Sequence, residues 1–90
     1  MFKSVRTGKF KKEFSLAEKR GKDMDKLIEI MRMIICEEPL PPQCRNHLLH
    51  GKWEKTFECH VEPDWLLIYE IDKSIGEVIF HRTGTHADLF

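Results

Sequence analysis

The stretch that decides the fold spans residues 56–71 and reads TFECHVEPDWLLIYEI. Its first seven residues alternate between polar and apolar side chains, which predicts a strand with one face against a core. Pro63 and Asp64 are typical turn residues, and the residues after them are mostly apolar on both faces, as in a central strand. The stretch therefore predicts two antiparallel strands, with His60 on the opposite face from Cys59.

Two amphipathic helices are predicted upstream of this stretch. Apolar residues recur at helical spacing between a possible cap at Thr7 and a possible stop at Gly21. A second helix can start at Asp23, and its apolar stripe is broad: Met24, Leu27, Ile28, Met31, Ile34 and Ile35. Because only a few residues join the two helices, we expect an antiparallel helical hairpin.

The remaining elements complete an α+β fold. A short strand is predicted at residues 2–6, prolines end the second helix, and residues 40–51 are expected to form an exposed loop. Another turn leads to a third strand of the meander at residues 77–83, followed by a glycine-containing tail. We therefore predict a single domain over residues 1–90, an antiparallel β-sheet covered on one face by the N-terminal α-helical hairpin.

Charge is distributed unevenly along a chain whose formal net charge is zero. Residues 1–22 hold eight Lys or Arg against two acids, whereas the remainder holds seven basic and thirteen acidic side chains. The basic region could contact a polyanion, which makes Lys9, Lys11 and Lys12 candidates for substrate binding. A solvated helix face is the alternative interpretation of the same residues.

The cysteines and the hydropathy exclude several classes of protein. Cys36, Cys44 and Cys59 are odd in number and have no paired spacing, so we expect reduced thiols, no disulfide, no metal and no cofactor. No apolar run is long enough to cross a bilayer, and no secretory signal begins the sequence. We therefore expect a cytoplasmic protein without a membrane partner.

The candidate catalytic residues come from the second half of the chain, which holds all five histidines. Histidine can accept and donate a proton near neutral pH, and arginine is a planar cation suited to phosphate. Because a meander brings strand ends together, we predict that His60, Asp64, Arg82 and His86 share a cleft. His47, in the proline-bounded loop, could close the far side of it.

Each candidate also has a structural interpretation. A strand histidine is commonly satisfied by its neighbours, an aspartate after proline commonly forms a turn, and Arg82 could pair with a carboxylate of the sheet. His50 and His81 are assigned structural roles, the latter because strand alternation should turn it away from Arg82. The aromatic side chains of Trp65 and Phe90 could pack in the core or stack on a base.

At these residues the sequence resembles the YafQ branch of the RelE/ParE toxin superfamily. The similarity runs over nearly the whole chain in four blocks: LAEKRGKDM at 16–24, NHLLHGKW at 46–53, HVEPDWLLIY at 60–69 and RTGTHADLF at 82–90. The family's functional residues fall here on His47, His60, Asp64, Trp65, Arg82, His86 and Phe90, and none is replaced. One departure is the neutral charge, because these toxins are usually basic.

The resemblance implies a RelE-like fold and a ribosome-dependent mRNA endoribonuclease, the toxin of a bacterial type II toxin–antitoxin pair. Its expected partners are a cognate antitoxin protein, the ribosome and mRNA, with operator DNA bound only through the antitoxin complex. No membrane or cofactor is implied.

Metal-free cleavage of RNA uses the 2′-hydroxyl of the substrate against the adjacent phosphate. We assign His86 as the general acid and either Asp64 or His60 as the general base, since the two candidates for the base can titrate as a pair. Arg82 would stabilise the charge of the phosphorane, and His47 would position the phosphate. Trp65 and Phe90 would stack on or beside the nucleotide.

Two other classes stay open on the residues alone. A toxin-fold protein could inhibit its target by binding without cleavage, in which case no cut message would appear in a translation extract. A small metal-binding protein could use Cys44, Cys59 and the histidines, in which case the purified protein would carry stoichiometric zinc.

Overall fold

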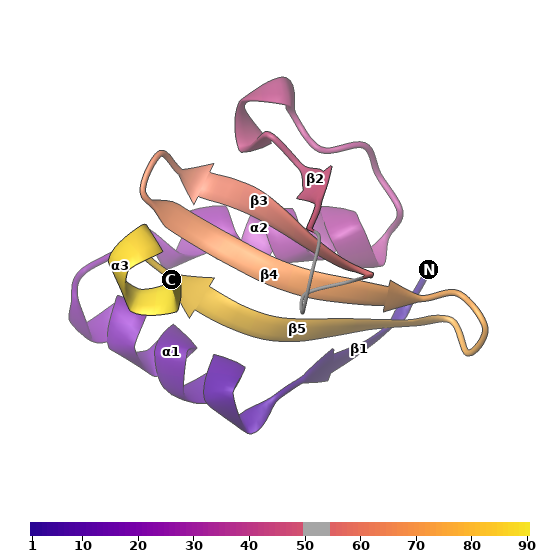
Figure 1. Cartoon of the computed structure of the whole chain (residues 1–90), viewed down its shortest axis with the longest axis horizontal. Helices are drawn as coiled ribbons and strands as arrows, with labels where there is room; N and C mark the ends of the chain where they lie inside the picture. Colours follow the sequence, from indigo (N-terminus) through magenta and orange to yellow (C-terminus); the bar gives the residue numbers. More distant parts are fainter. Residues whose placement is uncertain (50–54) are drawn as a thin grey trace.

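The structure is a computed structural model that describes residues 1–49 and 55–90. Its described part contains a sheet with the strand order β1-β5-β4-β3-β2 (Figure 1). The strands are β1 (Lys3–Arg6), β2 (His47–Leu48), β3 (Thr56–Glu62), β4 (Trp65–Asp72) and β5 (Glu77–Gly84). The helices are α1 (Gly8–Lys19), α2 (Met24–Ile35), the 3-10 helix η1 (Pro42–Cys44) and α3 (His86–Leu89).

The predicted α+β class and the meander β3-β4-β5 are confirmed, and β4 lies in the centre of the sheet as predicted. The strand predicted at the beginning of the chain pairs in parallel with β5, so the sheet is mixed and not wholly antiparallel. Two short elements were missed: β2 lies inside the predicted loop, and α3 replaces the predicted tail. The part of that loop around His50 lies outside the described residues.

The predicted ends of α1 are confirmed by its hydrogen bonds. Thr7 is the N-cap, and its side chain accepts a hydrogen bond from the backbone N–H of Phe10 at 3.0 Å. After the helix, Gly21 adopts a φ of 78°, and the next N–H, of Lys22, donates to Ala17 O at 3.1 Å. This is the Schellman end for which glycine is preferred.

The core lies between the two long helices and one face of the sheet. Apolar side chains of α1 and α2 pack there with the strand residues Cys59, Trp65, Leu67, Tyr69, Val78 and Phe80. Both helices pack mainly on the sheet, with α1 along β5 and α2 behind the sheet (Figure 1). On the opposite face, Leu89 of α3 covers Leu66 and Ile68. Since His60 is the cross-strand partner of Leu66, it belongs to the face that carries α3.

The cysteines are free, and two of them are buried. Burial raises the pKa of the Cys44 and Cys59 thiols, which disfavours the thiolate that metals and electrophiles require. In the described parts of the chain, no helix combines the length and the hydropathy needed to span a bilayer.

Candidate active site

Three of the predicted site residues meet at one end of the sheet. His60 lies near the end of β3, Asp64 lies in the turn to β4, and His86 is the first residue of α3. His86 Nδ1 lies 2.6 Å from Asp64 Oδ1, and the ring centroids of His60 and His86 are 5.7 Å apart. The structure therefore brings these two imidazoles and this carboxylate into one site.

Helix α3 sets the position of His86, and a capping box sets the position of α3. Thr85 Oγ1 accepts from the N–H of Asp88 at 3.1 Å, while Asp88 Oδ2 accepts from the N–H of Thr85 at 2.9 Å. A Cβ atom at Gly84 would lie 3.0 Å from the Asp88 side chain, so glycine permits this tight turn. The backbone N–H of His86 then donates to Asp64 Oδ1 at 2.9 Å. The T-x-x-D spacing of residues 85–88 was the sequence signal for this helix.

The hydrogen bonds at Nδ1 determine which imidazole nitrogen is free. The backbone N–H and then the side chain of His86 lower the pKa of Asp64, so this carboxylate is ionised and acts as an acceptor at neutral pH. His86 Nδ1 is therefore the donor, and its Nε2 is available. His60 Nδ1 likewise faces the carbonyl oxygen of Pro63 at 3.3 Å. His47 Nδ1 faces that of Arg45 at 2.7 Å. Each of these rings therefore presents Nε2.

Glu58 also belongs to the site, although no role was predicted for it. It precedes His60 by two residues on β3, so the two side chains share a face, and Glu58 Oε1 lies 3.6 Å from His60 Nε2. The E-x-H spacing on a predicted strand was the available signal. We call Glu58, His60, Asp64 and His86 the imidazole cluster. Among the described residues, Glu58, His60 and His86 are the set whose ligand atoms could hold a metal ion.

His47 lies beside this cluster. It is exposed on β2 and is the cross-strand partner of Glu58, so its side chain belongs to the same face of the sheet. Its contact with a substrate stays a prediction.

Arg82 is held by a carboxylate of α1. Its Nε and Nη2 atoms donate to the two carboxylate oxygens of Glu13, each at 2.8 Å, and Nη2 also lies 3.4 Å from Asp88 O. The hydrogen bonds to Glu13 raise the pKa of Arg82. Arg82 is therefore paired with a carboxylate, but the partner belongs to helix α1 and is not the sheet carboxylate that the structural interpretation expected. A phosphate that approached Arg82 would meet a guanidinium already in a bidentate pair.

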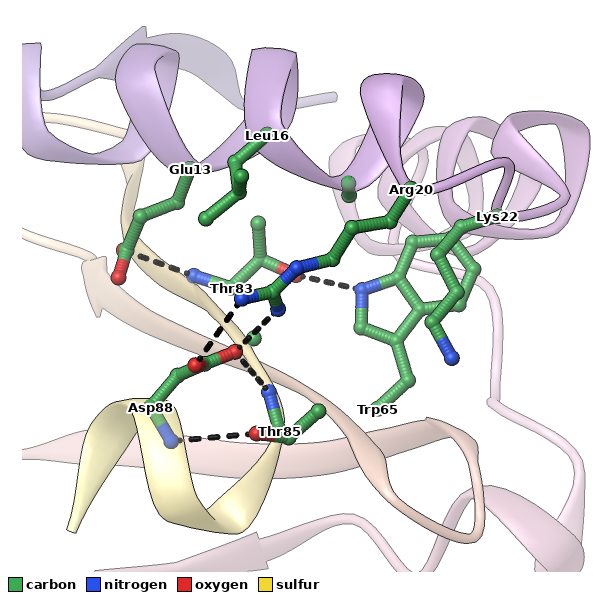
Figure 2. Close-up of a pocket in the computed structure, with 10 residues that line it drawn as sticks. Glu13, Leu16, Arg20, Lys22, Trp65, Thr83, Thr85 and Asp88 are labelled. Atoms are coloured by element: carbon green, nitrogen blue, oxygen red, sulfur yellow. Dashed lines mark hydrogen bonds and ion pairs between the residues drawn. The ribbon is translucent and has the colours of Figure 1, made fainter.

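A second ion pair joins the end of α1 to α3. Arg20, the C-cap residue of α1, reaches across a cavity of about 170 Å³ to Asp88 of α3, with Nη1 and Oδ2 2.8 Å apart (Figure 2). Arg20 is the main reason that the pKa of Asp88 is lowered to about 2. We call Glu13, Arg20, Arg82 and Asp88 the α1–α3 ion-pair network.

The predicted aromatic contacts differ in exposure. Trp65 is 1% exposed, and its Nε1 donates to Thr83 Oγ1 at 3.0 Å at the side of the same cavity (Figure 2). In this arrangement its ring packs in the core and has no open face for a base. Phe90 follows α3 and is 62% exposed, so it is accessible to a nucleotide.

Four other residues considered from the sequence are not members of the cluster. Lys9, Lys11 and Lys12 are exposed on α1, and their contact with substrate stays a prediction. His81 sits where the pairing of β4 and β5 shifts register, and its Nε2 lies 2.9 Å from Glu70 Oε1. This pair agrees with the structural role assigned to His81.

Comparison with known proteins identifies several close relatives. Residues 2–90 match the family described as "Bacterial toxin of type II toxin-antitoxin system, YafQ". The mRNA interferase toxin YafQ of Escherichia coli K12 is 45% identical over 85 residues, which are 93% of this chain and 90% of that protein. YafQ in the crystal structure of the E. coli DinJ–YafQ complex has a TM-score of 0.92 and 42% identity, covering 100% of this chain and 99% of that one. A metal-bound toxin from Helicobacter pylori has a TM-score of 0.94 and 33% identity, with both chains covered completely.

Proposed function

Since this chain belongs to the YafQ family of toxins from bacterial type II toxin–antitoxin systems, we infer that it is an mRNA interferase, an endoribonuclease that cuts messenger RNA. Its partner is an antitoxin protein, as DinJ is for YafQ in E. coli. We further propose that residues 1–90 act as one toxin domain in the cytoplasm, that cleavage takes place on translating ribosomes, and that operator DNA is bound only through the antitoxin complex. The exposed lysines of α1 are suited to ribosomal RNA because they form the basic part of a neutral chain.

The proposed chemistry is proton transfer without a metal. The 2′-hydroxyl of the substrate attacks the adjacent phosphorus, a base takes the 2′ proton, and an acid protonates the departing 5′ oxygen. His86 is suited to be the acid because Asp64 binds its Nδ1 and stabilises the charged ring, which leaves Nε2–H to donate.

The Asp64–His86 hydrogen bond of 2.6 Å is the observation that carries this proposal. Because Asp64 Oδ1 already accepts two hydrogen bonds from His86, Asp64 is better suited to orient His86 than to take a proton from substrate. His60 is then the better candidate for the base, since Pro63 O accepts from its Nδ1 and the lone pair of Nε2, 3.6 Å from Glu58 Oε1, can accept a proton in the neutral ring. Arg82 would stabilise the phosphorane after exchanging Glu13 for phosphate, while His47 and Phe90 would position the nucleotide.

Cleavage by a His86→Ala variant tests this function. The parent and the variant would be expressed in bacteria, and the 5′ ends of messages would be mapped. The parent should arrest growth and create new ends inside coding regions, whereas His86→Ala should cut roughly 10²–10⁴ times more slowly. His81→Gln is the matched control, because it also removes an imidazole paired with a carboxylate, outside the cluster. Equal cleavage by the parent and His86→Ala would refute the assignment of the acid.

A further inference from the structure

A second cavity, of about 340 Å³, adjoins His60 and shares no lining residue with the cavity of Figure 2. Its walls come from the loop after α2, from the end of β3 and from the turn that follows: Gln43, Arg45, His60, Val61, Glu62 and Pro63. Sites for small ligands usually have volumes of about 300–1,000 Å³. The volume of this cavity lies at the lower end of that range and suits a ligand of the size of a nucleoside.

The turn that carries Gln43 and Arg45 is anchored by the residue between them. Cys44 is 3% exposed and packs in the core. Arg45 adopts the left-handed conformation, with a φ of 47° and a ψ of 45°, and its N–H donates to Pro42 O at 3.1 Å. Its carbonyl oxygen lies 2.7 Å from His47 Nδ1. The backbone of the turn is therefore fixed between the core and His47, as precise recognition of a ligand requires.

The polar groups of this cavity differ in whether they already have partners. The carboxylate of Glu62 lies 3.1 Å from Lys26 Nζ and 3.6 Å from Lys22 Nζ. By contrast, the guanidinium of Arg45 and the amide of Gln43 are exposed and make no hydrogen bond or ion pair to another described residue. A guanidinium matches a phosphate, and an amide matches the edge of a base. The two side chains together therefore suit a nucleotide.

The proposed proton transfers indicate which nucleotide would lie here. The base acts on the 2′-hydroxyl of the nucleotide on the 5′ side of the cut, whereas the acid acts on the 5′ oxygen of the nucleotide on the 3′ side. His60, the candidate for the base, lines this cavity. His86 and Phe90 lie in and directly after α3. The sugar next to Gln43 and Arg45 is therefore that of the nucleotide on the 5′ side.

We propose that this cavity binds the nucleotide on the 5′ side of the scissile bond, that Gln43 selects adenine there, and that Arg45 holds the phosphate 5′ to that adenine. The amide of glutamine matches N6 and N7 of adenine, and these atoms are accessible in single-stranded RNA. The guanidinium of arginine matches a phosphate through two parallel donors. The inference rests on the proposed function and adds a base preference to it.

Cut sites in a randomised message test the choice of base. Messages randomised at one codon would be cut in a translation extract, and the new ends would be mapped for each sequence. For the parent we expect adenine on the 5′ side of the cut to be favoured roughly 5–150-fold. Gln43→Ala should remove this preference. Gln43→Glu should favour cytosine, because a carboxylate accepts from the amino group of cytosine but would face the N7 acceptor of adenine.

An uncharged phosphate tests the role of Arg45. A synthetic message with a methylphosphonate 5′ of the selected nucleotide should be cut by the parent roughly 10–100-fold more slowly than the unmodified message. In Arg45→Ala this loss should be much smaller, because the contact is already absent. Arg45→Lys should keep part of the loss, since lysine binds phosphate as a point charge. Arg6→Ala removes a guanidinium from β1, at the other edge of the sheet, and should show the full loss of the parent.

Four results would contradict these assignments, with the folding of each variant verified by circular dichroism. Equal cutting after all four bases by the parent, or an unchanged preference in Gln43→Ala, would overturn the base assignment and leave the nuclease function intact. Equal losses from the uncharged phosphate in the parent and in Arg45→Ala would place Arg45 on another ligand, such as ribosomal RNA. A parent that cuts no message at all would overturn the proposed function itself.

Discussion

Helix α3 contributes one side chain to each of two neighbouring regions, His86 to the imidazole cluster and Asp88 to the α1–α3 ion-pair network. In the network each charge faces an opposite charge: Arg20 is 2.8 Å from Asp88, and Arg82 is 2.8 Å from Glu13. In the cluster each imidazole uses Nδ1 for a hydrogen bond and presents Nε2. In the network the charged groups pair with one another. In the cluster the Nε2 atoms of the two histidines can still bind a further partner.

The charged groups of the two regions therefore have different roles, structural in the network and chemical in the cluster. Paired groups hold α1 against β5 and α3, and they have little left with which to bind a substrate. Incompletely paired titratable groups in a shared site are the more usual place for chemistry. Substitutions in the cluster should therefore change the rate of cleavage with little change in stability. Substitutions in the network should do the reverse.

The largest effect is expected for Asp64→Asn. The amide would offer an N–H₂ group to His86 Nδ1 and favour the wrong tautomer, so cleavage should fall by about 10²–10⁴-fold. Because the Asp64 side chain is 66% exposed, the free energy of unfolding should change little. Cleavage kinetics and chemical denaturation of the same protein would measure both quantities.

The double variant separates orientation from direct catalysis. If Asp64 acts through His86, Asp64→Asn should cost far less rate in a His86→Ala background than in the parent. His60→Ala should still lower the remaining rate in that background, since His60 acts on a different proton. An equal cost of Asp64→Asn in both backgrounds would instead make Asp64 an independent base.

More of the imidazole cluster than of the α1–α3 ion-pair network could be predicted from the sequence. His60 and Asp64 could be placed because strand alternation and a proline turn are local patterns, and these determine the end of the meander. Arg82 could be located at the end of its strand, but its partner Glu13 is 69 residues away and belongs to another element. No local pattern encodes that contact.

Exposure was the other property that local patterns did not determine. The sequence allowed Trp65 to stack on a base or to pack in the core, and the choice depends on α1 and Thr83, which close around the ring. Helix α3 was missed for a different reason. Its four residues are too few for a hydrophobic period, although its capping box was present in the sequence.

An intermediate effect is expected for Glu13→Gln, and mainly on stability. Glu13 accepts from Arg82 Nε and Nη2 and from the N–H of Thr83 at 3.2 Å. An amide offers one acceptor atom and turns a donor toward the guanidinium, so the free energy of unfolding should fall by about 1–3 kcal/mol. In a domain of this size the Tm should fall by roughly 4–8 °C per kcal/mol. Cleavage should fall far less than in Asp64→Asn.

Glu18→Gln is the matched control for this prediction. Glu18 is an exposed acid of the same helix, and its side chain has no ion pair among the described residues. Its replacement should leave the Tm unchanged. If Glu13→Gln instead lost cleavage by as much as Asp64→Asn while its Tm stayed constant, the distinction between the two regions would be wrong.

The smallest effect is expected from protonation of Asp88. The folded-state pKa of Asp88 is lowered to about 2, below the value of about 3.9 for an unperturbed aspartate. Its contribution to stability is therefore fully present above about pH 4 and is lost as the pH falls toward 2. Because the Arg20 side chain is 44% exposed, this contribution should not exceed about 1 kcal/mol.

Hydrogen exchange in α3 can detect such a small change because it reports on the helix alone. The amide of Leu89 donates to Thr85 O at 3.1 Å, and its protection factor should fall in the parent between pH 4 and pH 2. Asp88→Asn should start with lower protection and show no further fall in that range. Asp72→Asn, which alters an aspartate with a lowered pKa at the end of β4, should follow the parent. If protection in Asp88→Asn still fell as it does in the parent, acid would loosen α3 through a group other than Asp88. The Arg20–Asp88 pair would then have no measurable part in positioning His86.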